Sequence, residues 1–273
     1  MNLDEALNHL AEQEDAALDL AELALWLARD EYPNLDVDAY LSELDGMAHE
    51  AKSYLRGSLE ARVTGLCRYL FYEMGFRGNT QDYYDPRNSY FNQVLDRRTG
   101  IPITLSVLAM AVGQRAGLQV VGVGLPAHFV AKALDEGREV LFDPFHGGRQ
   151  LTPADCENLV HQVAGMAIEA TPDALSAMPL RALVTRMLSN LKAIYQKEGD
   201  FARTVRVLER LHQLNPSDLI QRRDLGIGLF QAGQLGRAVD HLSAYLTVVS
   251  QGQEADLVRQ VLNRAMAELG RWN

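Results

Sequence analysis

Cysteine is scarce in this chain of 273 residues, which contains only Cys67 and Cys156. Two cysteines this far apart do not make a disulfide framework, and neither belongs to a CxxC pair of the kind that binds zinc. With 47% hydrophobic residues, the chain can bury one large core or two modest ones. The shortage of cysteine therefore excludes a disulfide-held scaffold and a thiolate zinc site.

Positive charge is also in deficit, with 26 Lys and Arg against 36 Asp and Glu and a net charge of −10. This balance disfavours contact with nucleic-acid phosphates and with anionic membrane surfaces. The acidic first 33 residues lack the basic segment and unbroken apolar core of a signal peptide, and no apolar run approaches the length that spans a bilayer. We therefore expect a cytoplasmic protein that binds neither nucleic acid nor membrane.

Apolar residues at helical spacing predict that residues 1 to about 75 are helical. One stripe includes Ala16, Leu20 and Leu23 beside Trp26, and Pro33 ends it. Further stripes follow in residues 37–47 and 59–76. We expect these apolar residues to form core rather than a functional site.

The segment 77–100 is dense in Asn, Asp, Gly and aromatic residues, which predicts an irregular loop. We expect Asn88 or Ser89 to cap a short helix through Leu95. Polar loops with interleaved aromatic residues often line clefts, so Asn88, Tyr90 and Asn92 are candidate ligand-binding residues. The alternative is an ordered connector with packed tyrosines.

Residues 102–117 predict a buried helix, because almost every position is apolar or small. Pro102 suits the first helical position and Gly117 the end of the helix. We expect this helix to be the centre of a domain, with only its N-terminus near a surface.

The next segments, 118–134 and 138–145, are rich in Val, Phe and Leu and predict β-strands, with a turn at residues 135–137. If the strands pair about a centre between Asp135 and Glu136, His128 and Asp143 are direct cross-strand neighbours. A register slip of one residue would separate them. A carboxylate on one ring nitrogen of His128 would fix the tautomer and raise the basicity of the other nitrogen.

A nucleophile facing His128 would complete a hydrolase or acyltransferase site. The N-terminus of the buried helix is the best place for it, and Thr104 and Ser106 offer hydroxyls there, although hydroxyls need stronger activation than a thiol. Cys67 falls inside an amphipathic helix, where buried thiols are inert, and Cys156 follows both partners in the chain.

Two other interpretations of the His–Asp pair stay open. His128, Asp143 and His146 could form an open three-ligand metal site, but their spacing is not diagnostic. The pair could also serve only to hold the two strands of the hairpin together. Because no spacing in the sequence is diagnostic of a metal site, we expect no metal and no other cofactor.

From about residue 176 the chain is helical again and repeats itself. Gly199 and Gly233 lie 34 residues apart, and apolar positions around them correspond, such as Leu191 with Leu225. This period is typical of tetratricopeptide repeats, whose helix pairs must stack on neighbours to bury their apolar faces. We expect a last helix at about 254–269 to cap them.

Three motifs together resemble the SirB-type family, in which a transglutaminase-like domain precedes tetratricopeptide repeats. They are "NSYFNQVLDRRTGIPITLSVLAMAVGQRAGL", "GVGLPAHFVAKA" and "FDPFHGGRQLT". The resemblance covers nearly the whole chain. It implies an α+β fold with a papain-like core in residues 1–175 and a repeat domain in 176–273. It also implies that His128 and Asp143 hold the family's His and Asp positions. Its nucleophile position falls near Ile103 or Thr104, where active transglutaminase-like enzymes have Cys.

Two functions follow as hypotheses. The first is a non-catalytic protein that acts in protein–protein interaction or regulation and binds a protein or peptide through its repeats. The second is a cryptic hydrolase or amide-transfer enzyme in which Thr104, Ser106 or a water attacks, with His128 as base and Asp143 orienting it. A hydroxyl within about 3–4 Å of the His128 ring would favour the second.

Overall fold

The computed structural model describes residues 1–13 and 18–271, which form two compact units, and Ala16 of the first predicted stripe lies outside them. One unit spans residues 18–187, and the other contains helix α1 (Leu3–Glu12) and residues 188–271. The division therefore falls inside helix α8 (Leu180–Glu198) instead of at the predicted boundary of 175 and 176. The reason is that residues 176–187 attach to the sheet. Met178 N–H donates to the carbonyl of Gly122, and Leu183 packs beside that glycine.

Helices α2 (Leu20–Ala28), α3 (Val37–Ala51) and α4 (Leu59–Cys67) form the first part of the larger unit. Each begins where a side chain, on Asp19, Asp36 or Ser58, accepts hydrogen bonds from backbone N–H groups of the first turn. A short 3₁₀ turn, η1 (Lys52–Tyr54), lies between α3 and α4. Helix α4 continues directly into a π-helical segment, η2 (Arg68–Glu73). The predicted helices and the buried position of Trp26 are confirmed.

The polar segment that follows is held by two short parallel strands, β1 (Arg77–Gly78) and β2 (Thr99–Gly100). Between them lie a 3₁₀ turn, η3 (Pro86–Asn88), and helix α5 (Phe91–Arg97). The predicted cap was wrong, because the N-cap is Tyr90 and no side chain caps this helix. Asn88 belongs to the preceding turn, where its amide bonds to the loop instead.

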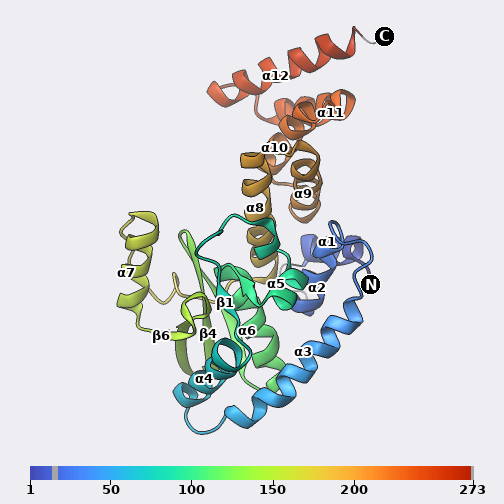
Figure 1. Cartoon of the computed structure of the whole chain (residues 1–273). Helices are drawn as coiled ribbons and strands as arrows, with labels where there is room; N and C mark the ends of the chain where they lie inside the picture. The colour runs from blue at the N-terminus through green and yellow to red at the C-terminus, as the bar shows by residue number, and fades with distance from the viewer. Residues whose placement is uncertain (14–17, 272–273) are drawn as a thin grey trace. The chain divides into compact units, whose positions relative to one another are not determined.

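Helix α6 (Pro102–Ala116) is the predicted buried helix, and it ends at Gly117 with φ 90°. It packs on an antiparallel sheet whose strands lie in chain order: β3 (Gln119–Leu125), β4 (His128–Asp135), β5 (Arg138–Asp143) and β6 (Arg149–Leu151). Figure 1 shows α6 beside β4 of this sheet. The prediction that the N-terminus of α6 lies near a surface was wrong. Pro102 and Ile103 are buried because the loop around Asn88 and the turn η4 (Pro144–His146) lie against this end.

The predicted register of the β4–β5 hairpin was also wrong. Glu136 and Gly137 both have positive φ and form a two-residue turn, so its centre lies one residue later than predicted and Asp135 pairs with Arg138. The partner of His128 is Leu125 on β3, across an unpredicted turn at Pro126 and Ala127. Each β4–β5 pairing is therefore displaced by two residues, which leaves every side chain on its predicted face.

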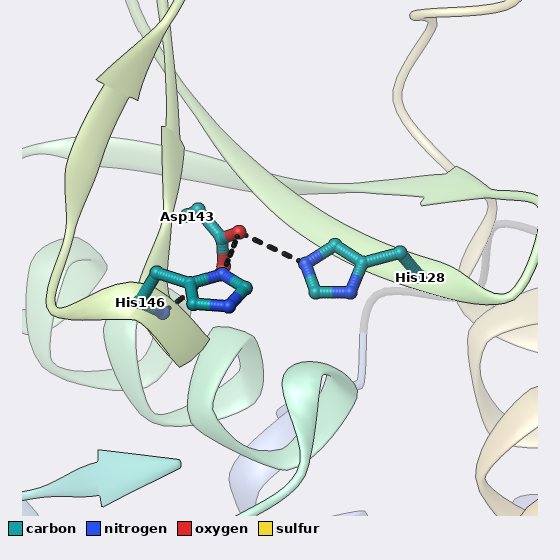
Figure 2. A group of neighbouring side chains, drawn as sticks. All are labelled: His128, Asp143 and His146. Atoms are coloured by element: carbon teal, nitrogen blue, oxygen red, sulfur yellow. Dashed lines mark hydrogen bonds and ion pairs between the residues drawn. The ribbon is translucent and has the colours of Figure 1, made fainter. Parts of the chain in front are cut away.

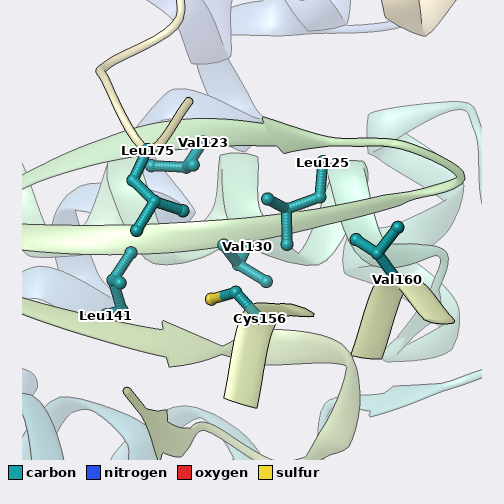
Figure 3. Close-up of a cluster of buried hydrophobic side chains, with 7 residues drawn as sticks. All are labelled: Val123, Leu125, Val130, Leu141, Cys156, Val160 and Leu175. Carbon is teal, nitrogen blue, oxygen red and sulfur yellow. The ribbon is translucent and has the colours of Figure 1, made fainter. Parts of the chain in front are cut away.

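The face of the sheet away from α6 is covered by helix α7 (Pro153–Ala164). Figure 3 shows the cluster of buried side chains there, which includes Cys156 and Val160 of α7 and Leu175 of the segment that follows. The sheet is thus buried on both faces, and its strand ends are fixed in place.

The second unit contains the repeats. Helices α9 (Phe201–Leu214), α10 (Leu219–Gln231), α11 (Leu235–Val248) and α12 (Gln253–Leu269) follow α8. Gly199 and Gly233, each with positive φ, make the turns of two helix pairs, as the 34-residue period predicts. Helix α1 packs on α9 through Arg210 and Asp4, a contact between distant parts of the chain. None of the helices in the described ranges is both long and apolar enough to cross a membrane.

Candidate functional site

Three polar side chains meet where β4 begins and β5 ends (Figure 2). His128 is the first residue of β4, Asp143 the last of β5, and His146 the last of η4. The Oδ2 atom of Asp143 lies 3.0 Å from Nε2 of His128 and 2.7 Å from Nδ1 of His146. The predicted proximity of His128 and Asp143 is confirmed despite the wrong register, because a displacement of two residues keeps both on one face.

The second carboxylate oxygen of Asp143 fixes the orientation of the group. Oδ1 accepts the backbone N–H of Phe145 at 3.0 Å and that of His146 at 3.4 Å. Burial raises the pKa of the Asp143 carboxyl, but hydrogen bonds and charge from His128 and His146 outweigh burial and leave the pKa below its ordinary value. The group therefore stays ionised and can hold both imidazoles.

The two imidazoles differ in their access to solvent. His128 is only 4% exposed, and the ring of Phe145 stands edge-on to it with centroids 6.1 Å apart. The His146 ring is stacked on the His128 ring, with centroids 5.8 Å apart, and the His146 side chain is 52% exposed. The ring of His128 is thus enclosed, and His146 is the member of the cluster that solvent reaches.

Arg186 of α8 holds the backbone of His128, and sequence reasoning did not find this residue. Its guanidinium donates to the carbonyls of Leu125 and His128, on both sides of the turn, and lies over the Phe129 ring at 5.3 Å. Burial lowers the pKa of Arg186. Nothing near position 186 in the sequence signals this contact, because its partners lie about sixty residues earlier.

The two candidate hydroxyls are fully buried and engaged with the backbone. Thr104 Oγ1 donates to the carbonyl of Asn88 at 2.8 Å and accepts the N–H of Ile101 at 3.1 Å. Ser106 Oγ donates to the carbonyl of Pro102 at 2.8 Å. These bonds give both hydroxyls structural partners, and their nucleophilic role stays a prediction.

Both thiols are buried. The Cys67 side chain packs so closely on Gly148 that a Cβ atom on this glycine would overlap it. Burial raises the pKa of the Cys67 thiol to about 12. Burial, together with neighbouring carboxylates, raises the pKa of the Cys156 thiol to about 11. A thiol with such a pKa is not a thiolate at neutral pH and is a poor nucleophile.

The candidate ligand-binding residues are interior. The Asn88 side chain is completely buried and bonds to the carbonyl of Asp82 and the amide of Asn79. Tyr90 packs edge-on against Tyr32, and Asn92 is 3% exposed. Their proposed contact with a ligand remains a prediction.

A cavity of about 650 Å³ adjoins the cluster and is lined by His146, Arg68, Tyr72 and Arg149, among others. Chemically, the cluster can hold or move a proton at an imidazole. It can also offer three ligand atoms to a cation, since those of His128, Asp143 and His146 all lie within 4.8 Å of one another.

Comparison with known proteins gives the family. Residues 38–189 match the model of the transglutaminase-like superfamily, and residues 191–263 match that of the tetratricopeptide repeat. A UPF0162 protein of Xylella fastidiosa is 35% identical over 264 residues, which cover 92% of each chain. F-box only protein 21 of Mus musculus is 32% identical over 161 residues, which cover 56% of this chain and 25% of that protein.

Among solved structures, the crystal structure of menin that reveals the binding site for Mixed Lineage Leukemia protein covers 96% of this chain and 74% of that one. Its TM-score of 0.42 and identity of 11% are too low for any transfer. The match of the superfamily model over more than half the chain and the full-length relative agree with the fold. The chain belongs to the UPF0162 family of SirB-type proteins, in which a transglutaminase-like domain is followed by tetratricopeptide repeats.

Proposed function

We propose that this protein is a non-catalytic member of its superfamily that acts in protein–protein interaction and binds a protein or peptide partner through its repeat helices. The observation that carries the proposal is the state of the two hydroxyls at the start of α6. Thr104 and Ser106 are buried and donate to backbone carbonyls, so neither hydroxyl is presented to a substrate.

The proposed location is the cytoplasm, since two free thiols suit a reducing compartment.

The surface of the repeat helices supports an interaction role. Large apolar side chains are exposed on all four helices that follow α8: Phe201, Ile220, Val248, Leu257 and Met266. Exposed apolar groups mark a contact with another protein when they form a contiguous patch, and the proposal requires this arrangement of these residues. Stacked helix pairs of this kind present extended surfaces to peptides and helices.

The test is capture of partners by the full-length chain from cells of its source, with identification by mass spectrometry. Ile220→Glu and Leu257→Glu each place a charge on the surface of the repeat helices. Ile220 is 55% exposed and Leu257 is 62% exposed, so neither change should disturb the fold. We expect at least one of them to reduce recovery of the partner about tenfold or more, because charge in the centre of an interface is strongly unfavourable. The double variant His128→Ala, Asp143→Ala should keep the partner if it folds.

The matched control is Tyr72→Glu, which makes the same kind of change at a residue 77% exposed in the other unit. If both repeat variants capture the partner as well as the unchanged chain does, or Tyr72→Glu abolishes capture, the repeats are not the binding surface. Circular dichroism of every variant separates loss of binding from loss of fold.

The retained His128–Asp143 contact favours a second candidate function, a hydrolase or amide-transfer enzyme that uses His128 to activate a water or a hydroxyl. Such an enzyme would hydrolyse or transfer amide groups of test peptides, and His128→Ala would abolish that activity. Absence of any turnover that depends on His128 would exclude it.

A further inference from the structure

The ligand atoms of His128, Asp143 and His146 converge in a way that suits a cation. Two ring nitrogens point at the same carboxylate oxygen, at 3.0 and 2.7 Å, and come from separate elements, β4 and η4. A transition metal bound about 2.0–2.2 Å from nitrogen and oxygen ligands keeps those ligands roughly 3–3.5 Å apart. An outward movement of less than about 1 Å at each nitrogen–oxygen contact therefore makes room for an ion.

We propose that His128 Nε2, Asp143 Oδ2 and His146 Nδ1 together bind one divalent transition-metal ion of the zinc class. Two imidazoles and one carboxylate are the donors preferred by Zn²⁺, Co²⁺, Ni²⁺ and Fe²⁺, whereas Mg²⁺ and Ca²⁺ prefer oxygen donors alone. Three protein ligands leave at least one coordination position for water.

The surroundings of the cluster prepare two of the three ligands. The carboxylate of Asp143 is oriented by the N–H groups of Phe145 and His146, and the backbone of His128 is clamped by Arg186. Partners behind the ligands hold them in place before the metal arrives and so raise affinity. His128 and Asp143 are buried, so most of the movement that an ion requires would fall on His146.

The third ligand provides adjustment and access. His146 is half-exposed at the end of a three-residue turn, and two glycines follow it. It also lines the cavity of about 650 Å³, which gives an ion a route from solvent. A proposed metal site needs such an entry path as well as correct ligands.

The rival interpretation is that protons alone join the two imidazoles to the carboxylate. The two differ in a measurable way, because only a metal site binds Co²⁺ stoichiometrically and gives it the visible absorption of a low-coordinate ion. The titration uses the full-length, untagged and chelator-treated protein, with Co²⁺ followed by absorption and Zn²⁺ as competitor. We expect one equivalent of Co²⁺ to bind, and Zn²⁺ to displace it.

Two variants assign the ligands. His146→Ala removes the half-exposed ligand with little effect on folding and should weaken Co²⁺ binding about tenfold or more, since even changes behind the ligands cost this much. His49→Ala removes an exposed histidine on α3 and should leave binding unchanged.

The proposal is overturned if no equivalent of Co²⁺ binds, or if His146→Ala binds it as tightly as the unchanged chain. The titration contains no partner protein and measures no turnover, so its outcome is independent of the proposed interaction role.

Discussion

Asp143 is the residue on which the site depends, because one of its oxygens contacts two imidazoles and the other caps η4. An aspartate whose role was only to orient His128 would need neither the contact with His146 nor the hydrogen bonds from the backbone N–H groups of Phe145 and His146. Burial alone would raise the pKa of the carboxyl, and the hydrogen bonds and charge of the two imidazoles explain why it lies below its ordinary value.

Thr104 has a structural role that can be separated from that of Ser106. Thr104→Val leaves the carbonyl of Asn88 and the N–H of Ile101 buried without this partner, so we expect it to lower the free energy of unfolding by about 2 kcal/mol. Ser106→Ala should cost less than about 1 kcal/mol, because the carbonyl of Pro102 keeps its bond within the helix. Urea unfolding followed by circular dichroism measures both.

Thr104→Ser is the control for this prediction, since it keeps the hydroxyl and should recover most of the lost stability. Equal losses in Thr104→Val and Ser106→Ala would contradict the assignment of Thr104 as the tie between the loop and α6.

At the scale of elements, local patterns predicted what local physics decides. The limits of α6 follow from Pro102 and Gly117, and the helix pairs of the repeats follow from the spacing of Gly199 and Gly233. Each signal depends on a backbone preference carried by a single residue type. The fold class was predictable for the same reason, with the family resemblance in support.

Three details of these elements were not predictable, two for local reasons and one because it depends on a long-range contact. The cap of α5 moved to Tyr90 because the side chain of Asn88 bonds to its own loop. The hairpin register differs from the predicted one because Glu136 has positive φ. Glutamate rarely adopts this conformation, so the sequence does not predict it. The clamp by Arg186 arises only when α8 packs on β3. The His–Asp contact was nevertheless predicted correctly, because the register error was two residues and not one.

The turn after η4 gives a prediction with a built-in control. Gly147 and Gly148 both have positive φ, at 71° and 79°, but only a Cβ on Gly148 would meet Cys67. Gly147→Ala should therefore cost about 1 kcal/mol of strain, and Gly148→Ala about 2–4 kcal/mol, because its Cβ would also overlap the Cys67 side chain. Denaturant unfolding compares the two, and equal costs would mean that Cys67 moves aside freely.

At the scale of the whole molecule, aspartates of both units set the response to strong acid. Both contain aspartates whose pKa lies below the ordinary value, such as Asp143 in one and Asp200 in the other. A carboxyl with a lowered folded-state pKa stabilises the fold above its unfolded-state pKa of about 3.9, and that stability is lost as pH falls through the folded-state value. These carboxylates therefore protect both units until strongly acidic pH.

The repeat unit also contains a pair of histidines that makes it sensitive at a milder pH. His212 of α9 and His241 of α11 stand edge-on with ring centroids 5.4 Å apart, and in the described part of the chain each Nδ1 is buried without a hydrogen-bond partner. Burial, and then the charge of Arg222, lowers the pKa of both imidazoles. The unfolded chain takes up protons at these residues near pH 6.5 while the folded unit does not, so stability falls as pH drops below that value.

We therefore expect helices α9–α11 to lose protection against hydrogen exchange between pH 7 and pH 5, after correction for intrinsic rates, while helix α6 keeps its protection. His241→Gln removes one imidazole that resists protonation, so the loss between these pH values should shrink. His161→Gln changes an exposed histidine of α7 and serves as the control. Undiminished protection of α9–α11 at pH 5, or an unchanged loss in His241→Gln, would show that this pair does not set the acid response.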